Sequence, residues 1–213
     1  MIDWETSKNP VDFDFAVKRM QQRVADIYHK KSNQLIWLLE HPHLFTAGTS
    51  AKEEHLLQKN LLPVVKSERG GSFTYHGPGQ RIIYLMLDLE KHGKDLRTFV
   101  WNLEEWVIKS LDELGIVGER CDGRVGIWIA PNNASHSNKE RKIASIGLRV
   151  RHWISYYGIS INVNPKLEYF QGIVPCGNEG FGVTSLHKEG LKTTVTELDN
   201  ILKKQFEKKF RPY

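Results

Sequence analysis

Cysteine is scarce in this chain, which holds only Cys121 and Cys176 among its 213 residues. Small domains that depend on disulfides carry far more cysteines for their length, so two thiols indicate a reducing compartment. No CxxC or HExxH pair occurs, and His41 and His43, which flank a proline, are more typical of a turn than of a metal site. The sequence therefore predicts a cytoplasmic protein that uses no metal and no cofactor.

Long apolar runs are also missing. The longest strongly apolar stretch covers residues 82–87, far short of the ~20 residues that cross a bilayer. Residues 1–10 contain two acidic side chains and no apolar core, so they do not predict a secretory signal or a transit peptide. We expect no membrane partner.

The excess of charge is small and positive. Lysine and arginine number 30 against 25 acidic residues, a formal charge of +5, which favours an acidic partner without identifying it. The basic residues do not alternate with aromatic residues as in proteins that bind single-stranded nucleic acid, so we expect no nucleic-acid partner. The composition is that of a globular protein, and the length predicts a single domain over residues 1–213.

The hydrophobic pattern alternates between helical and strand periods. Apolar residues at helical spacing predict three helices, over 13–29, 96–114 and about 198–210. Short apolar or alternating stretches predict strands at 34–40, 62–67, 81–89, 125–130, 146–150 and 157–163. The last two are close enough to form a hairpin. This order predicts the α+β class, a mixed β-sheet with helices packed on it.

Residues 69–80 (RGGSFTYHGPGQ) form the most unusual segment, with four glycines and a proline. Such a composition predicts a loop of special backbone geometry, in which backbone N–H groups can approach an acyl or phosphate-like group. The segment matches neither the GxxxxGK[ST] nor the GxGxxG pattern, so it does not indicate nucleotide binding. A ligand-binding loop is favoured over a plain connection between strands.

Two residues are candidates for catalysis. Cys176 lies between a proline and a glycine, where backbone is irregular and near the surface, so it is either a nucleophile or an inert thiol. A thiol with a pKa near ~8.5 needs a positive neighbour or a base before it reacts. Lys142 directly precedes the apolar residues 143–147, which would draw its stem into the sheet. A partly buried ammonium group stabilises a thiolate and can pass a proton. We interpret Cys121 as structural.

Four blocks occur in one order along the chain: EHPxxFTxG at 40–48, RGGSFTYHGPGQ at 69–80, KIASIG at 142–147, and PCG at 175–177 followed by GVTSL at 182–186. Together they resemble the lipoyl(octanoyl) transferase family over about residues 13–206. The resemblance implies the fold of biotin and lipoate protein ligases. It also implies octanoyl transfer from acyl carrier protein to a lysine of lipoyl domains, those of 2-oxoacid dehydrogenases and the glycine cleavage H protein, as the first step of lipoate biosynthesis.

The resemblance assigns roles to matching residues. Cys176 matches the nucleophile that carries the acyl group as a thioester, and Lys142 matches the lysine that activates it. The residues that match substrate-binding segments are Arg69, Gly70, Gly71, Ser72, Phe73, Thr74, Tyr75, His76, Ser145, Ile146, Gly147, Gly158, Ile159 and Ser160. Ser145 and Ser160 stand where family members often carry alanine. His76 is either an orienting group in catalysis or a polar residue that satisfies the loop.

The alternative within this fold is an ATP-dependent lipoate or biotin protein ligase, which makes an acyl-adenylate and needs no cysteine. The missing phosphate-binding loop favours the transferase, because exchange of one thioester for another and then for an amide needs no nucleotide. Acyl carrier proteins are acidic, so Arg149 and Arg151 are candidate contacts with the donor.

Overall fold

The computed structural model describes residues 1–131, 139–174 and 180–210. Within these residues the strands form two sheets. The large sheet has the order β1-β2-β6-β10-β9-β8-β7, and β11 also pairs with β9. Its strands are β1 (Ile2–Thr6), β2 (Gln34–Leu39), β6 (Gln80–Met86), β7 (Glu119–Cys121), β8 (Arg124–Ile129), β9 (Arg141–Arg151), β10 (Ile154–Asn162) and β11 (Gly182–Val183). The small sheet has the order β4-β3-β5, formed by β3 (Leu44–Ala47), β4 (Val64–Lys66) and β5 (Phe73–His76).

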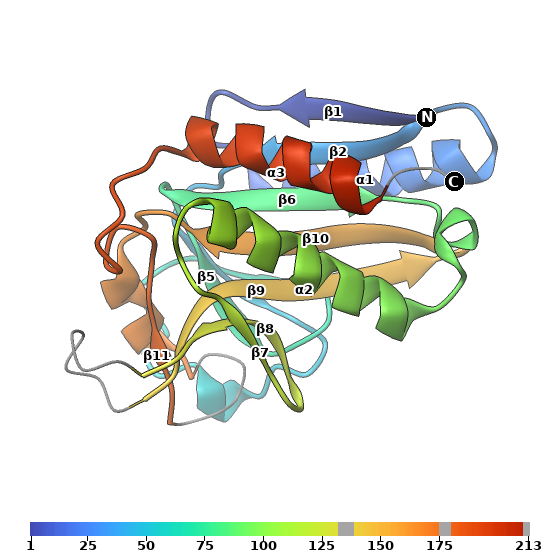
Figure 1. The fold of residues 1–213 in the computed structure, drawn as a ribbon. Helices are drawn as coiled ribbons and strands as arrows, with labels where there is room; N and C mark the ends of the chain where they lie inside the picture. Colours follow the sequence, from blue (N-terminus) through green and yellow to red (C-terminus); the bar gives the residue numbers. More distant parts are fainter. Residues whose placement is uncertain (132–138, 175–179, 211–213) are drawn as a thin grey trace.

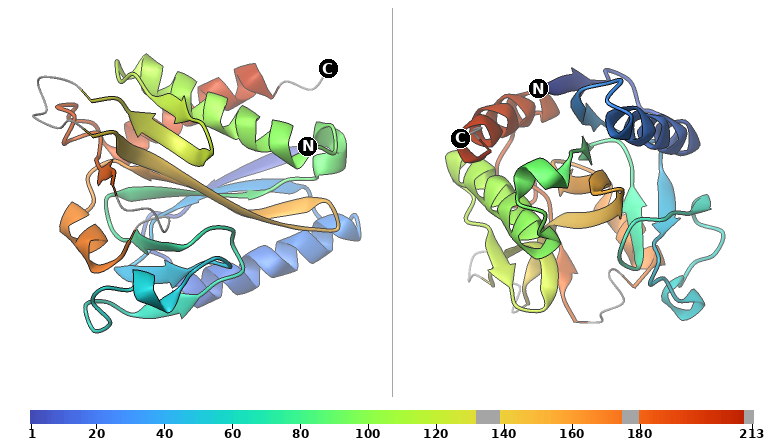
Figure 2. Two further views of the ribbon diagram at one scale, coloured as in Figure 1. Left: turned by 90° about the horizontal axis from the view of Figure 1, so that it is seen from below. Right: turned by 90° about the vertical axis from the view of Figure 1, so that its right-hand side faces the viewer.

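Helices cover both faces of the large sheet. Figure 1 shows α2 (Leu96–Glu113) and α3 (Val195–Lys209) in front of the sheet and α1 (Phe13–Tyr28) behind it. The end-on view in Figure 2 places the sheet between these two layers. The part of the chain that the structure describes also contains the short 3₁₀ helices η1 (Glu53–His55), η2 (Leu89–His92) and η4 (Leu167–Gly172).

Side chains of the central strands divide between the two layers. On β2, Ile36 and Leu38 pack toward α2 and α3, whereas Leu35, Trp37 and Leu39 pack toward α1. Every residue of β2 and β6 is buried for this reason, which explains why both read as continuous apolar runs rather than as alternating strands.

Each of the helices α1, α2 and α3 begins where a side chain caps it. The Asp12 carboxylate accepts from Phe15 N at 2.9 Å, and Asp95 accepts from Arg97 N at 2.9 Å. Thr194 and Glu197 form a reciprocal capping box at the start of α3. The two helices on one face are joined where Trp106 Nε1 donates to Leu202 O at 2.8 Å.

The predicted fold class, the three helices and the β9–β10 hairpin are confirmed. The prediction that all of residues 69–80 form a loop was wrong, because 73–76 is strand β5. Phe73 and Tyr75 bury their rings against Phe45 in a third core cluster, so this stretch pairs with β3 despite its glycine neighbours. The sequence also did not reveal β1, β3 and β7, which are short strands without a clear alternating pattern.

No helix within the described residues combines the length and the apolar character needed to cross a bilayer.

Candidate active site

A cavity of about 450 Å³ lies between the large sheet and the segment around β5. Its lining includes Lys142 and every residue predicted to bind substrate except Tyr75. Three segments that are distant in the sequence therefore meet around one space, namely residues 69–76, 145–147 and 158–160. A volume of this size is in the range of small-ligand sites.

Tyr75 lies elsewhere. Its ring is buried with Phe45 and Phe170, and its Oη hydrogen-bonds with His43 Nδ1 at 2.8 Å. Burial raises the pKa of Tyr75 far above its usual value, so the phenol stays neutral. Tyr75 was predicted to bind substrate, but it does not line the cavity. Its ring packs in the core beneath the small sheet.

The floor of the cavity consists of small residues on β9 and β10. Ser145 lies opposite Ser160, and Gly147 lies opposite Gly158, in the antiparallel register of these strands. At Gly158 no side chain fits, because an added Cβ would lie 2.0 Å from Ile83 O on the neighbouring β6. These short side chains leave the space above the sheet that larger residues would fill. Ile146 and Ile159 also border the cavity but belong to the core under α2 and α3.

Lys142 reaches the cavity through an irregularity in the sheet. Ile127 of β8 pairs with Ala144, but the next residue, Trp128, pairs with Lys142. One extra residue of β9 is thus inserted, which places both Ile143 and Ala144 in the core on the helix side. Side chains of a regular strand alternate, so without this bulge Lys142 would share the face of Ala144 and point away from Ser145.

The Lys142 side chain is held in place within the protein. The residue is only 5% exposed, and its Nζ donates to Val125 O at 3.1 Å. The ammonium nitrogen also lies 4.5 Å from the centroid of the Trp128 ring, a cation–π contact. Gly126 permits this approach, because a Cβ there would lie 3.4 Å from Lys142 Nζ and 2.7 Å from Ala144 O.

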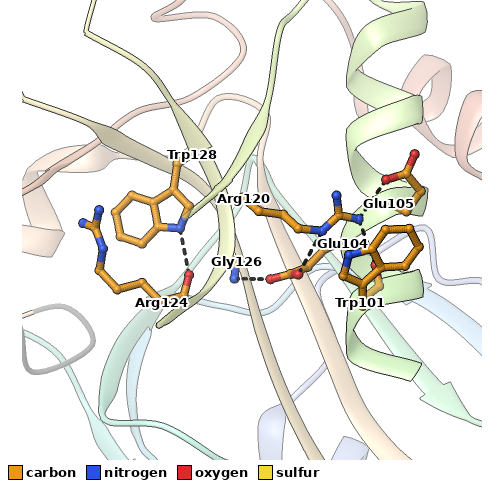
Figure 3. A network of polar contacts seen from close by, with 7 residues as sticks. All are labelled: Trp101, Glu104, Glu105, Arg120, Arg124, Gly126 and Trp128. Carbon is orange, nitrogen blue, oxygen red and sulfur yellow. Dashed lines mark hydrogen bonds and ion pairs between the residues drawn. The ribbon is translucent and has the colours of Figure 1, made fainter. Parts of the chain in front are cut away.

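A polar network ties β7 and β8, and with them the support of Lys142, to helix α2 (Figure 3). The Glu104 carboxylate accepts from Gly126 N at 3.0 Å and lies 3.3 Å from Arg120 Nε. Arg120 also pairs with Glu105 at 2.8 Å and lies over the Trp101 ring. In the same view Trp128 Nε1 donates to Arg124 O at 3.0 Å. The network fixes the position of the strand against which the ammonium group rests.

Cys176 lies outside the described residues. The described chain resumes before β11, where Val183 pairs in parallel with Lys142 and Thr184 N donates to Lys142 O at 3.0 Å. Residues 182–184, which come after residue 176 in the sequence, therefore run beside the lysine. The other cysteine, Cys121, is partly buried beside Arg124 and Glu140 and does not line the cavity.

His76 takes part in a chain of hydrogen bonds at the cavity wall. Gln80 Nε2 donates to Asn162 Oδ1 at 2.9 Å, so Gln80 Oε1 accepts from His76 Nδ1 at 2.7 Å. The other ring nitrogen lies 3.3 Å from Thr46 Oγ1 and accepts from it. Burial, with the nearby His41 and Arg69, lowers the pKa of His76 to about 3. The ring is neutral with both nitrogens occupied, which favours a positioning role over proton transfer.

Arg69 organises the glycine-rich segment from within. Its guanidinium donates to Thr46 O at 2.7 Å, Ser72 O at 2.9 Å and Gly70 O at 3.0 Å, and the residue is only 9% exposed. Gly48 allows the segment to pack closely, because a Cβ there would lie 2.3 Å from Gly71 O. The block at 40–48 is thus the support on which the segment at 69–76 is shaped.

Sequence reasoning missed several residues that line the cavity. They are Phe13, Ile82, Tyr84, Leu96, Val100, Gly123, Arg124, Val125, Trp128, Leu148 and Tyr157. Most belong to the predicted helices and strands, where periodicity marks a buried residue without showing whether it faces a core or a cavity. Leu148 and Tyr157 directly adjoin the predicted substrate-binding segments 145–147 and 158–160, a position that could have identified both.

Arg149 and Arg151 lie toward the far end of β9. They are seven and nine residues from Lys142, about 23 and 30 Å along a strand. If these two arginines contact the acyl donor, as we expect from the sequence, that contact lies far from Lys142.

Comparison with known proteins agrees with this geometry. Residues 12–207 match the family model described as the lipoyl protein ligase A/B catalytic domain. Among curated relatives, an octanoyltransferase of Bartonella bacilliformis is 49% identical, covering 99% of this chain and 89% of the relative. Octanoyltransferases of Jannaschia sp. (50%, covering 97% of both chains) and Wolbachia pipientis wMel (45%, covering 99% and 100%) are similarly close.

Solved structures share the fold at low sequence identity. A bi-partite lipoate protein ligase of Thermoplasma acidophilum superposes with a TM-score of 0.69 at 16% identity, covering 99% of this chain and 84% of the other. A lipoate-protein ligase A bound with ATP gives a TM-score of 0.69, also at 16% identity, covering 98% and 85%.

Proposed function

The chain belongs to the lipoyl protein ligase A/B catalytic domain family, and we propose that it transfers an octanoyl group from acyl carrier protein to lipoyl domains through a thioester on Cys176. Its relatives at 45–50% identity are named octanoyltransferases, which supports acyl transfer in lipoate synthesis. One structural observation carries the proposal furthest. Lys142 is buried at the wall of a cavity whose floor is made of small residues, beside the strand that follows Cys176.

The first half-reaction exchanges thioesters. With the thiol proton held on Lys142 as an ammonium–thiolate pair, the Cys176 thiolate attacks the carbonyl carbon of the donor thioester. The bond from that carbon to the donor sulfur breaks, and the leaving thiolate takes the proton back from Lys142. Bonds of the same kind are formed and broken, so this step is close to isoenergetic.

The second half-reaction forms an amide. The amine of the acceptor lysine attacks the Cys176 thioester, the carbon–sulfur bond breaks, and the amine proton passes to Lys142. An amide is more stable than a thioester, so the transfer is downhill without a nucleotide. A substituted-enzyme intermediate of this kind predicts ping-pong kinetics.

The cavity can supply the binding energy for the acyl chain. Burying the methylene groups of an octanoyl chain is worth about 5–6 kcal/mol at ~0.8 kcal/mol per group, before ordering costs. The donor is expected to be acidic, in keeping with the formal charge of +5. The acceptors we propose are lipoyl domains of 2-oxoacid dehydrogenases and the glycine cleavage H protein, in the cytoplasm.

Intact-mass spectrometry after incubation with octanoyl-acyl carrier protein tests the proposal. We expect the wild type and Cys121→Ser to gain one octanoyl group and Cys176→Ser to gain none. Octanoylation of Cys121 instead would overturn the assignment. Transfer of free octanoate that needs ATP and survives Cys176→Ser would identify the chain as an ATP-dependent ligase.

A further inference from the structure

Strand β10 carries a backbone feature at the cavity that its regular neighbours lack. Tyr157 has a φ of 59°, in the left-handed region that residues other than glycine seldom adopt. Successive side chains of a regular strand point to opposite faces. Here the rings of Tyr156 and Tyr157 instead stack, with centroids 5.1 Å apart and an interplanar angle of 27°. The left-handed residue thus turns the second ring to the same side as the first.

Both tyrosine side chains contact Glu68, the residue directly before the glycine-rich segment. Tyr156 Oη donates to Glu68 Oε2 at 2.8 Å, and Glu68 N donates to Tyr157 Oη at 3.4 Å. The sheet compensates for the irregularity through a side chain. Ser155 Oγ donates to Leu85 O at 2.7 Å and accepts from Leu87 N at 3.2 Å, which links β10 to β6 where the ladder is interrupted. The unusual conformation is therefore supported from both sides of the strand.

Of the two tyrosines, only Tyr157 lines the cavity. Gly147 and Gly158 form the part of the floor that lies further from Lys142. Tyr157 lies beside this pair, on the side away from Lys142. The glycine-rich segment contacts the sheet at the same level. Gly70 N donates to Leu148 O at 3.1 Å, and a Cβ on Gly147 would lie 3.1 Å from Gly70 O. The Tyr157 ring also meets Tyr84 edge-on, with centroids 6.1 Å apart. These contacts hold the Tyr157 ring in the cavity wall at this level of the sheet.

The distance from the ammonium group to Tyr157 fits a medium-length chain. Lys142 Nζ lies against Val125 and Gly126, and Gly126 neighbours the Ile127–Ala144 pair, which places the nitrogen near the level of Ser145 and Ser160. From Ser160 to Tyr157 is three residues, about 10 Å along a strand. An extended octanoyl chain has seven carbon–carbon bonds of about 1.5 Å, which span about 9 Å in zigzag form.

We propose that Tyr157 determines the length of the acyl chain that the protein accepts, as the wall at the end of the cavity furthest from Lys142. The inference rests on the proposed function and adds a residue that sets its substrate range. A chain of eight carbons that begins beside the ammonium group ends at the ring, and two to four further methylene groups would collide with it.

The test is a comparison of octanoyl-, decanoyl- and dodecanoyl-acyl carrier protein as donors. Tyr157→Gly removes the ring and suits the positive φ, because glycine adopts this conformation without strain. We expect the ratio of kcat/KM for dodecanoyl to that for octanoyl donor to rise at least about tenfold over the wild type, since a collision of even one methylene group is worth about that factor.

Two variants serve as controls. Tyr157→Phe retains the ring and should keep the wild-type ratio. Tyr156→Leu removes the stacked ring that does not line the cavity. This variant should also keep the wild-type ratio. If Tyr157→Gly fails to fold, as judged by circular dichroism and a melting curve, Tyr157→Leu provides the same comparison.

The inference is overturned if the glycine or leucine variant transfers octanoyl groups with an unchanged ratio, or if Tyr156→Leu raises the ratio equally, which would indicate general loosening. A wild type that accepts no acyl chain from any carrier would instead refute the proposed function itself.

Discussion

Ser145 of β9 and Ser160 of β10 are direct cross-strand partners beneath the cavity. Fourteen residues and a hairpin turn separate them in the sequence. Because the strands are antiparallel, the two segments that resemble acyl-binding segments form a single surface, continued by the pair Gly147 and Gly158. The two serine side chains thus meet at one place on the cavity floor.

Removing these two hydroxyl groups should improve the use of octanoyl donors. An octanoyl chain that covers a hydroxyl takes it out of water without offering a partner, a cost of about 0.5–2 kcal/mol. We expect kcat/KM for octanoyl-acyl carrier protein to rise about two- to thirtyfold in Ser145→Ala and in Ser160→Ala. Steady-state rates measure this, and a double variant shows whether the paired positions are coupled. A fall in kcat/KM in both single variants would show that the hydroxyls assist the reaction.

Alanine substitutions at Gly147 and Gly158 should have very different effects on the free energy of unfolding. A Cβ on Gly158 would lie 2.0 Å from the backbone of Ile83, which cannot move without distorting β6. We expect Gly158→Ala to lower the free energy of unfolding by about 3 kcal/mol or more. At Gly147 the nearest atom, Gly70 O at 3.1 Å, lies outside the regular strands and can shift, so the loss should stay within about 1 kcal/mol. Urea denaturation followed by circular dichroism compares the two, and equal losses would contradict this account.

The proposed activation of Cys176 predicts a change in its reactivity. In a Cys121→Ser background, iodoacetamide reports on Cys176 alone. Replacement of Lys142 by alanine should lower the alkylation rate at pH 7 about tenfold, as expected when the thiol pKa rises by one unit. Lys203→Ala, which removes an exposed charge on α3, serves as the control and should leave the rate unchanged. A Lys142→Ala rate equal to that of the control would exclude Lys142 as the activating group.

Two buried histidines should make the folded state sensitive to acid. Burial lowers the pKa of His76 to about 3 and that of His41 to about 4. In the unfolded chain both titrate near ~6.5, so below that pH the unfolded state binds more protons and stability falls as the pH falls. Each histidine contributes up to about 1.4 kcal/mol per pH unit between pH 6.5 and 4.5.

The variant His76→Gln separates this effect from a loss of packing. We expect it to be less stable at pH 6.5 but to show a shallower dependence on pH, because one of the two titrating groups is gone. Urea denaturation at pH 4.5, 5.5 and 6.5 provides the slopes. Parallel slopes for the two proteins would show that His76 is protonated in the folded state.

The amino-acid sequence by itself determined the elements whose signals are local. Apolar residues at helical spacing placed α1, α2 and α3, and alternation placed the β9–β10 hairpin. Composition also marked residues 69–80 as unusual, and two of the four blocks, at 69–80 and 142–147, contain residues that line the cavity. These features depend on residues within a few positions of one another, so a single chain reveals them. The role of Cys176 remains a prediction, since it lies outside the described residues.

Only the tertiary structure decided which side chains face the cavity. The inserted residue at Ile143 turns Lys142 to the side of Ser145, and the left-handed Tyr157 turns its ring beside that of Tyr156. Strand β5 forms within a glycine-rich stretch because β3 offers it a partner. Each of these outcomes depends on register between strands that are far apart in the chain. A shift of one residue reverses the face of a side chain while the local pattern stays the same.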